Sequence, residues 1–354
     1  MTKKTLGFCL LLILILGVFF AIGNSKKIGV TSEKEVLGVI VPLSGPAGSM
    51  GEFVKNAIDL ADAKHVTIEY QDDQCDGKKA LSSYQELKLK GAKIFYVACS
   101  GSVLALAPLA KNDGNLIITA YAGSAEIRKT GDEVIRFIPD ALTIVDAMKE
   151  YFKENTANTT YAILYEEQDY PKSVADGVVA ALGSKLLIKE TYRPDSTDMR
   201  SQLTKIKGKN VDKLVFVPVS DATAKIALGQ MRDLGLKTTV VGDVNLCGYP
   251  FSPSDFGQKT VCWNAELDKK EANIFADIYK AKYASTSTYP FYDAITYDSI
   301  GIVDDLVGSA GSKKDLIPYL KSHILGGIKG KISSYEFEPN GEVMGVNYLK
   351  MVEK

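Results

Sequence analysis

The sequence predicts an α/β fold made of two similar halves, each a doubly wound and mostly parallel sheet. From Val36 onward, short apolar segments alternate regularly with segments of helical periodicity, which is the pattern of successive strand–helix–strand units. A second series of the same kind begins after Pro139 and Asp140. With 354 residues, of which 46% are hydrophobic, the chain is long enough to bury two sizeable cores.

The chain begins with a targeting signature. Lys3 and Lys4 precede an uncharged run over residues 6–23, which predicts a hydrophobic helix. Small residues would allow cleavage after Gly23, but the run is also long enough to span a bilayer. We therefore expect residues 1–27 to be a signal peptide or a membrane anchor. The rest of the chain is expected to be extracytoplasmic, in the periplasm or on the outer face of the cytoplasmic membrane.

The first half is predicted to contain four strands with helices between them. Residues 36–43 and 93–98 are continuous apolar runs, as expected for parallel strands covered on both faces. Residues 51–63 carry apolar side chains at helical spacing. The predicted elements are strands 36–43, 66–70, 93–98 and 116–119, and helices 51–63, 78–90 and 102–111.

Residues 95–105 combine the end of a strand, a tight turn and the start of a helix. The turn contains Ser100, Gly101 and Ser102. The first amides of a helix have no partner within the helix and lie at its positive end. In an open α/β sheet such a turn lies at the carboxyl edge, where small ligands bind. The turn therefore suits a carboxylate, although either serine could serve only as a helix cap.

The second half repeats the alternation up to Trp263, beyond which helices follow one another. The end of the chain is predicted to form a β-hairpin. The predicted strands are 161–165, 185–192, 213–217 and 238–241, with hairpin strands 331–337 and 346–352. The predicted helices are 144–154, 172–182, 199–206, 222–234, 271–283, 293–307 and 315–321.

Four of the five cysteines lie outside the N-terminal run, which contains Cys9. An even number in an oxidising compartment predicts two disulfides. The simplest pairing joins nearby segments, Cys75 with Cys99 and Cys247 with Cys262. A zinc site is the alternative, which the absence of short C-x-x-C spacing disfavours.

Composition argues against several classes of function. The formal net charge is −1, and no cluster of lysines and arginines marks a nucleic-acid-binding face. The two histidines, His65 and His323, are expected to be structural or exposed. The chain lacks a G-x-S-x-G motif and a nucleotide-binding glycine motif after residues 36–43. We therefore expect no enzymatic activity, metal or cofactor, and a secreted enzyme is only a remote alternative.

Several motifs resemble, in the same order, the branched-chain amino acid binding proteins, which are the leucine/isoleucine/valine-type solute receptors of ABC importers. The most specific are Asp-Asp-x-Cys-Asp at residues 72–76 and Cys-Ser-x-Ser at residues 99–102. The others lie at residues 37–46, 166–170 and 330–341. The resemblance covers nearly all of the chain after the N-terminal run. In that family the cysteines of the two most specific motifs form a disulfide.

The resemblance implies a two-lobed, type I periplasmic-binding fold with a three-strand hinge and a ligand cleft between the lobes. One lobe would comprise residues 35–140 and 264–325, and the other would comprise residues 141–263 and 326–354. The hinge would close the lobes around the ligand. The protein is expected to be a monomer.

The resemblance also implies an amino-acid site at the carboxyl edges of the sheets. Ser100 would bind the ligand's carboxylate, and the loop after the next strand would offer a carbonyl to its ammonium. On the second lobe Tyr170 would cover the ligand, and Asp243 is the nearest acidic residue for the ammonium. The expected ligand-binding residues are Met50, Ser100, Gly101, Ser102, Tyr121, Gly123, Ser124, Tyr170 and Asp243.

Departures from the family's pattern leave the identity of the ligand open. Met50 stands where relatives usually have an aromatic residue, and Gly123 or Ser124 stands where they usually have a threonine. Tyr121 is bulky where small residues are common. Asp243 does not align cleanly with the family's acidic residue and could instead cap a turn. Similarly, Tyr170 could be ordinary surface packing.

We therefore expect an extracytoplasmic solute-binding protein that captures a small ligand by hinge closure and delivers it to an ABC-type permease. The expected ligand is an amino acid, branched-chain or similar, with another small carboxylate or amide as the alternative. A sensor of the same fold, anchored by residues 6–23 and signalling through a partner protein, is the alternative function.

Overall fold

The computed structural model describes residues 34–154, 158–311, 315–345 and 349–354. The predicted hydrophobic helix over residues 6–23 lies outside the described residues. None of the helices in the described ranges combines the length and apolar character needed to cross a membrane. Residues 35–354 form one compact unit, which the following paragraphs describe.

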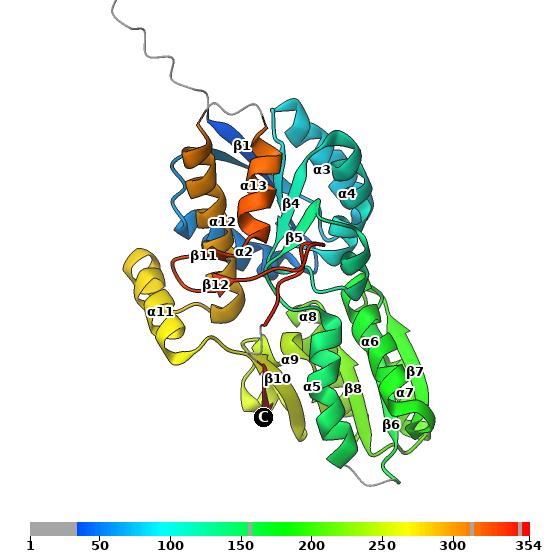
Figure 1. The fold of residues 1–354 in the computed structure, drawn as a ribbon. Helices are drawn as coiled ribbons and strands as arrows, with labels where there is room; N and C mark the ends of the chain where they lie inside the picture. The colour runs from blue at the N-terminus through cyan, green and yellow to red at the C-terminus, as the bar shows by residue number, and fades with distance from the viewer. Residues whose placement is uncertain (1–33, 155–157, 312–314, 346–348) are drawn as a thin grey trace, which may run out of the picture. The chain divides into compact units, whose positions relative to one another are not determined.

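The first sheet has five parallel strands in the order β2–β1–β3–β4–β5 (Figure 1). Its strands are β1 (Glu35–Val41), β2 (Val66–Asp72), β3 (Ile94–Val97), β4 (Leu116–Thr119) and β5 (Val134–Arg136). Every residue of β3 and β4 is buried, as their continuous apolar sequences predict. The sequence analysis missed β5, which at three residues is too short to show a periodicity.

Helices cover both faces of this sheet (Figure 1). One face packs against α2 (Gly48–Leu60), α12 (Pro290–Ala310) and α13 (Leu316–Leu325). The other face packs against α3 (Gly77–Leu89) and α4 (Ser100–Asp113). Helix α11 (Lys269–Tyr283) packs on α12 through Phe275 and Tyr279, and η1 (Ala125–Lys129) is a short 3₁₀ helix. We call the sheet with these helices the first lobe.

The second sheet has six strands in the order β13–β10–β9–β8–β6–β7, all parallel except for β13. Its strands are β6 (Tyr161–Glu166), β7 (Leu186–Tyr192), β8 (Lys213–Val217), β9 (Thr239–Gly242), β10 (Thr260–Ala265) and β13 (Leu349–Glu353). Two mostly parallel sheets therefore confirm the predicted α/β class.

This second sheet is also covered on both faces, and together with its helices it forms the second lobe. One face packs against α5 (Ala141–Glu154) and α6 (Asp169–Leu182). The other packs against α7 (Arg200–Gly208) and α8 (Asp221–Asp233). The short elements are η2 (Gly183–Lys185), α9 (Val244–Gly248) and α10 (Pro253–Phe256).

The predicted terminal hairpin is confirmed only next to its turn, where Phe337 and Val343 form an isolated antiparallel bridge. Beyond this bridge, the predicted strands pair with other segments. β12 (Ser334–Tyr335) pairs antiparallel with β11 (Ile328–Lys329), whereas β13 pairs antiparallel with β10. Tyr335 and Phe337 are buried in the core of the first lobe, each with its ring 5.1 Å from that of Phe137. We therefore propose that residues 326–343 belong to the first lobe rather than the second. Alternation in sequence shows that one face of a segment is buried, but it does not show which sheet buries it.

The chain crosses between the lobes at residues 137–140, after β5, and at residues 266–268, after β10. The third crossover of the hinge, predicted at residues 325–326, remains a prediction, and residues 346–348 lie outside the described residues. The other predicted lobe boundaries remain predictions.

Both predicted disulfides are present, so these four cysteines do not form the alternative zinc site. Cys75 is bonded to Cys99 and Cys247 to Cys262, with Cα atoms 5.3 and 5.5 Å apart. The first bond joins the turn after β2 to the turn after β3, and the second joins α9 to β10. Both therefore connect segments at or near the carboxyl edges of the sheets.

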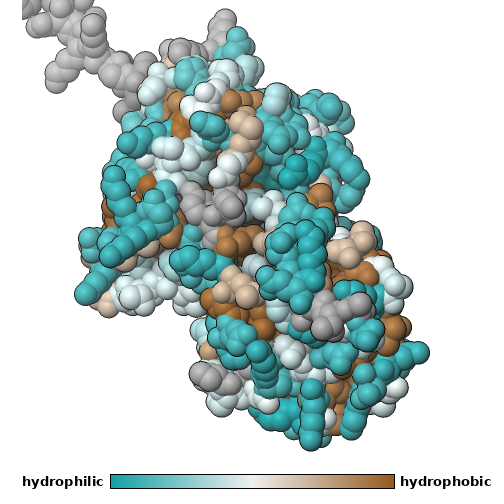
Figure 2. All heavy atoms as spheres, turned by 60° about the horizontal axis from the view of Figure 1, so that its bottom comes forward, coloured by the Kyte–Doolittle hydropathy of each residue, from teal (hydrophilic) through white to brown (hydrophobic). Residues whose placement is uncertain are grey.

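The face of the molecule in Figure 2 is largely hydrophilic, with apolar side chains in scattered patches. Large apolar side chains that are exposed in the described chain include Leu89, Leu187 and Met351. Singly exposed apolar residues are ordinary in soluble proteins.

Candidate functional site

A cavity of about 880 Å³, counting the space open to solvent, lies between the two lobes. It is lined by turns at the carboxyl ends of strands in both sheets, which is where open α/β sheets bind ligands. Six of the nine predicted binding residues line it: Met50, Ser100, Gly101, Tyr121, Gly123 and Tyr170. Ser102, Ser124 and Asp243 do not line it.

Ser100 is the first residue of α4, a helix of 14 residues whose N-cap, Cys99, makes no side-chain hydrogen bond. The first-turn amides of α4 therefore have no side-chain cap at the wall of the cavity. The Ser100 Oγ accepts a hydrogen bond from the Ser124 amide at 3.1 Å, which joins this turn to the loop after β4. The positive end of a helix and a hydroxyl thus meet on the first lobe.

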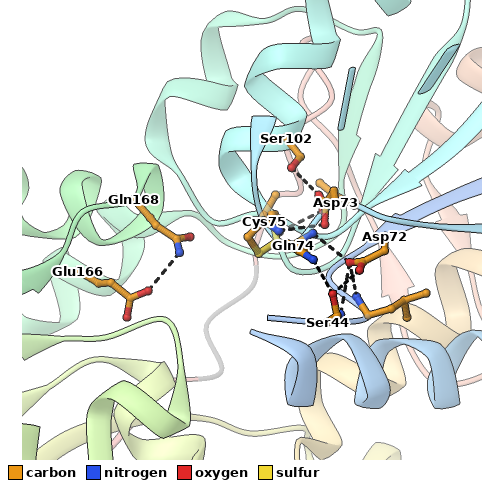
Figure 3. Close-up of a disulfide and its surroundings, with 12 residues drawn as sticks. Ser44, Asp72, Asp73, Gln74, Cys75, Ser102, Glu166 and Gln168 are labelled. Atoms are coloured by element: carbon orange, nitrogen blue, oxygen red, sulfur yellow. Dashed lines mark hydrogen bonds between the residues drawn. A yellow bond between two sulfur atoms is a disulfide. The ribbon is translucent and has the colours of Figure 1, made fainter. Parts of the chain in front are cut away.

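Ser102 supports this turn from behind. Its Oγ donates to Oδ2 of Asp73 at 2.5 Å, and both side chains are fully buried (Figure 3). Asp73 also accepts from the Cys75 amide at 3.1 Å. Burial raises the pKa of the Asp73 carboxyl, while these hydrogen bonds oppose the shift. Ser102 and Asp73 therefore hold the turn from the side away from the ligand space, whereas the disulfide of Cys75 and Cys99 is itself part of the cavity wall.

On the second lobe, Glu166 and Gln168 lie across from the Cys75 turn (Figure 3). Gln168 lines the cavity and donates to Glu166 at 3.1 Å. Glu166 is fully buried and also accepts from the Val219 amide at 3.2 Å and the Thr223 hydroxyl at 2.9 Å. Burial raises the pKa of the Glu166 carboxyl. This buried carboxyl joins the turn after β6 to the turn after β8, so both turns keep one arrangement at the cavity wall.

Two tyrosines of the cavity are each held by a buried aspartate. Tyr170 donates to Oδ2 of Asp243 at 2.8 Å, and Tyr121 donates to Oδ1 of Asp293 at 2.9 Å. Burial raises the pKa of Asp243 and of Asp293 to about 7 in each case. Asp243 also accepts from the Leu246 amide at 3.2 Å and so caps α9. Asp243 therefore positions Tyr170 and starts a helix, and its carboxyl is not part of the cavity wall.

Ser124, the third predicted residue outside the lining, lies where the lobes touch. Its Oγ is 3.0 Å from the Oγ of Ser173, which also accepts from the Ala125 amide at 3.1 Å. Elsewhere along the cleft, Ser49 donates to Asp221 at 3.0 Å, and the Ser220 hydroxyl donates to the Pro46 carbonyl at 2.8 Å. Hydrogen bonds thus join the lobes at two separate places, so the structure is a closed one.

Apart from tyrosines, the only acidic or basic side chains among the described residues that line the cavity are those of two aspartates. Asp169 and Asp221 line it from the second lobe, and no described lining residue is a lysine, arginine or histidine. The sequence analysis missed both, although Asp221 follows β8 at the carboxyl edge where ligands are expected. Five tyrosines share the wall, namely Tyr121, Tyr170, Tyr249, Tyr289 and Tyr292.

The pKa of Asp243 predicts a specific pH dependence of stability. Its value is about 7 in the folded protein and 3.8 without the fold, so the folded state holds an extra proton between these values. Folding therefore becomes less favourable as the pH rises from about 4 to about 7. The free energy of unfolding of Asp243→Asn, relative to that of wild type, should therefore rise by about 2–4 kcal/mol between pH 4 and pH 7. Above pH 7 this difference should stay constant.

Urea unfolding of both proteins at pH 4 to 8 would measure this difference. Asp195→Asn is the matched control, because Asp195 is mostly exposed and its substitution should produce no such trend. A stability difference for Asp243→Asn that stays constant across the range would contradict the raised pKa.

Comparisons with known proteins agree with this geometry. A family model described as periplasmic binding protein matches residues 36–321. The Leu/Ile/Val-binding protein BraC3 of Rhizobium johnstonii is 25% identical over 300 residues, covering 79% of this chain and 80% of that protein. Among solved structures, the substrate-binding protein LivJ of Streptococcus pneumoniae in complex with isoleucine superposes with a TM-score of 0.71 at 20% identity, covering 91% of this chain and 100% of LivJ. A solute-binding protein of R. palustris in complex with benzoate superposes with a TM-score of 0.76 at 16% identity, covering 91% of this chain and 95% of that protein.

Proposed function

Because the chain belongs to the periplasmic binding protein family, it is a solute-binding protein of the ABC-transporter type rather than an enzyme, and we propose that its ligand is an amino acid. The family also implies an extracytoplasmic location. We propose that closure of the two lobes captures the amino acid and presents it to an ABC-type permease.

The observation that carries this proposal is the opposition of charge across the cavity. The first lobe offers the uncapped start of α4 and the Ser100 hydroxyl, which suit a carboxylate. The second lobe offers the carboxylates of Asp169 and Asp221, which suit an ammonium. An amino acid carries both groups on one carbon, so it can engage both lobes at once. Asp221 takes the role that the sequence analysis expected for Asp243.

The benzoate-bound relative raises the alternative of an aromatic acid. Its fold is as similar to this chain as that of the isoleucine-bound relative, so the fold does not choose between the ligands. The cavity wall favours an amino acid, since an aromatic acid brings no positive charge to Asp169 and Asp221. Two carboxylates that face a bound anion would repel it.

Closure supplies the mechanism without any chemical step. A ligand stabilises the closed form only to the extent that it binds that form more tightly than the open one. A zwitterion that bridges the α4 turn and the Asp221 turn makes contacts with the second lobe that only closure allows. We propose that the protein acts as a monomer, because one chain provides both walls of the cavity. An anchored sensor signalling through a partner remains the alternative.

The proposal is tested by following the melting temperature of the chain from about Lys26 onward with each of the twenty amino acids and with benzoate. At 100 times its dissociation constant, the ligand should stabilise the protein by about 2.7 kcal/mol. Ser100→Ala should weaken its binding about tenfold, through the loss of a hydrogen bond to a charged group. Ser309→Ala, which alters an exposed serine of α12, should not change it. A shift with benzoate and with no amino acid would refute the amino-acid assignment and leave the fold intact.

A further inference from the structure

Tyr121 forms part of the first-lobe wall of the ligand cavity, and its side chain is held at the polar end. It lies in the loop after β4, two residues before Gly123, and is partly buried against the first-lobe core. Its hydroxyl donates to Oδ1 of Asp293 at 2.9 Å. Asp293 is fully buried in α12 and also accepts from the Ser287 hydroxyl at 2.6 Å, so the acceptor is itself fixed. A ligand therefore meets the ring of Tyr121 and not a free hydroxyl.

The ring and the backbone of Tyr121 are held as well. The centroid of its ring lies 5.1 Å from that of Tyr292, which packs against the cores of both lobes. The next residue is fixed on both sides of its peptide unit, since the Ala122 amide donates to the Thr119 hydroxyl at 3.1 Å and the Ala122 carbonyl accepts from Arg136 at 3.2 Å. A side chain fixed at its tip, its ring and its backbone cannot swing aside to make room for a ligand.

The second-lobe wall next to this loop is equally rigid. The hydroxyl of Tyr170 is bonded to the buried Asp243, and the ring of Tyr170 lies directly against Gly123. Hydrogen bonds between the lobes at two separate places set the distance between the two walls. In the closed form, the room beside Tyr121 is therefore set by fixed rings, which discriminate between ligands rather than adapt to each of them.

We infer that Tyr121 sets the upper size of the ligand, so that the bound amino acid has a short side chain that ends at its β or γ atoms. This inference rests on the proposed function, which puts the ligand's carboxylate at the Ser100 turn. A hydrogen bond from the Ser124 amide to the Ser100 hydroxyl joins that turn to the loop of Tyr121, so the α-carbon of the ligand lies close to the Tyr121 ring. A longer side chain that meets this ring would hold the lobes apart, because the ring cannot yield.

A series of straight-chain amino acids measures this limit. Calorimetric titrations of the wild-type chain would use alanine, 2-aminobutyrate, norvaline and norleucine, which grow by one methylene at a time at constant charge. Leucine and phenylalanine would test branched and aromatic side chains. We expect alanine or 2-aminobutyrate to bind most tightly, and norleucine and phenylalanine to bind at least tenfold more weakly than the tightest member.

Tyr121→Ala removes the ring. It should tighten the binding of norleucine at least tenfold relative to wild type while leaving the affinity for alanine nearly unchanged. Tyr121→Phe is the matched control, because it removes the same hydrogen bond to Asp293 but keeps the ring, and it should keep the wild-type preference for size. Tyr121→Leu leaves a smaller gap in the wall and provides a second test if Tyr121→Ala does not fold. It should also favour the longer ligands relative to wild type, though less strongly.

Three results would overturn the inference and leave the amino-acid function standing. One is tightest binding of norleucine, leucine or phenylalanine by the wild-type chain. Another is a preference for size that persists unchanged when the ring is replaced by alanine or leucine in a folded protein. The third is an equal loss of that preference in Tyr121→Phe, since the ring would then not be its cause. Binding of no amino acid at all would instead refute the proposed function together with this inference.

Discussion

Gly123→Ala is expected to weaken ligand binding by about 10- to 100-fold, because the added methyl group would hold the lobes apart. A Cβ atom at this position would lie 2.8 and 2.9 Å from two carbons of the Tyr170 ring, closer than such atoms approach in proteins. The ring cannot simply move aside, since its hydroxyl is bonded to the buried Asp243. Overpacking of this kind costs about 1–3 kcal/mol, which corresponds to the stated loss of affinity.

The effect should fall on closure and not on folding. Gly123 does not have a positive φ, so alanine can adopt its backbone conformation. Calorimetry would give the dissociation constant, and small-angle scattering would show whether the variant stays open with ligand present. Gly301→Ala is the control, because no described heavy atom other than those of its chain neighbours and of the adjacent α12 backbone lies within 4 Å of the added Cβ. That variant should bind normally and melt slightly higher, as helical glycine-to-alanine changes do.

Gly101 provides an internal comparison. A Cβ there would lie 2.7 Å from Oδ2 of Asp169, which is the end of a flexible side chain. Gly101→Ala should therefore weaken binding less than Gly123→Ala. Unchanged affinity in Gly123→Ala would mean that the contact between Tyr170 and Gly123 is absent from the ligand-bound form.

Arg136→Met should destabilise the protein by about 3–5 kcal/mol, the largest effect on stability that we expect from a single substitution. Arg136 is fully buried at the end of β5. Its guanidinium binds Glu342 and lies 3.7 Å from Oδ2 of Asp140. Removing it would leave a buried carboxylate without its partner, a change that is strongly destabilising.

The same guanidinium supports the ligand site. It donates to the carbonyls of Ala122 at 3.2 Å and Ser124 at 2.7 Å, on either side of Gly123. Urea unfolding followed by circular dichroism would measure the loss of stability. Arg200→Met is the control, since Arg200 is half exposed and its pairing with Asp198 should contribute at most about 1 kcal/mol. Equal effects of the two variants would contradict the structural role given to Arg136.

Local sequence was sufficient for the turn at Ser100. A continuous apolar run, followed by small polar residues and then a helical period, predicts a strand that leads into a helix start, and β3 and α4 confirm it. The cysteine pairing could be predicted as well, because the number and spacing of the cysteines and an oxidising compartment leave few arrangements.

The role of Asp243 could not be predicted in the same way. An aspartate at the end of a strand can face the cavity or cap the helix that follows, and both are compatible with the same local sequence. The choice depended on the hydroxyl of Tyr170, which lies 73 residues away in the sequence. The same limit applied to Asp221, whose partner Ser49 comes from the other lobe.

The sequence by itself thus determined the α/β class, the two sheets, the helix start at Ser100 and both disulfides, because periodicity, capping and cysteine spacing act over short stretches of chain. Only the tertiary structure decided which carboxylates face the cavity and that Tyr335 and Phe337 pack in the first lobe. The surroundings of a polar or apolar side chain are built by segments distant in sequence, and those surroundings decide whether it is paired, buried or available to a ligand.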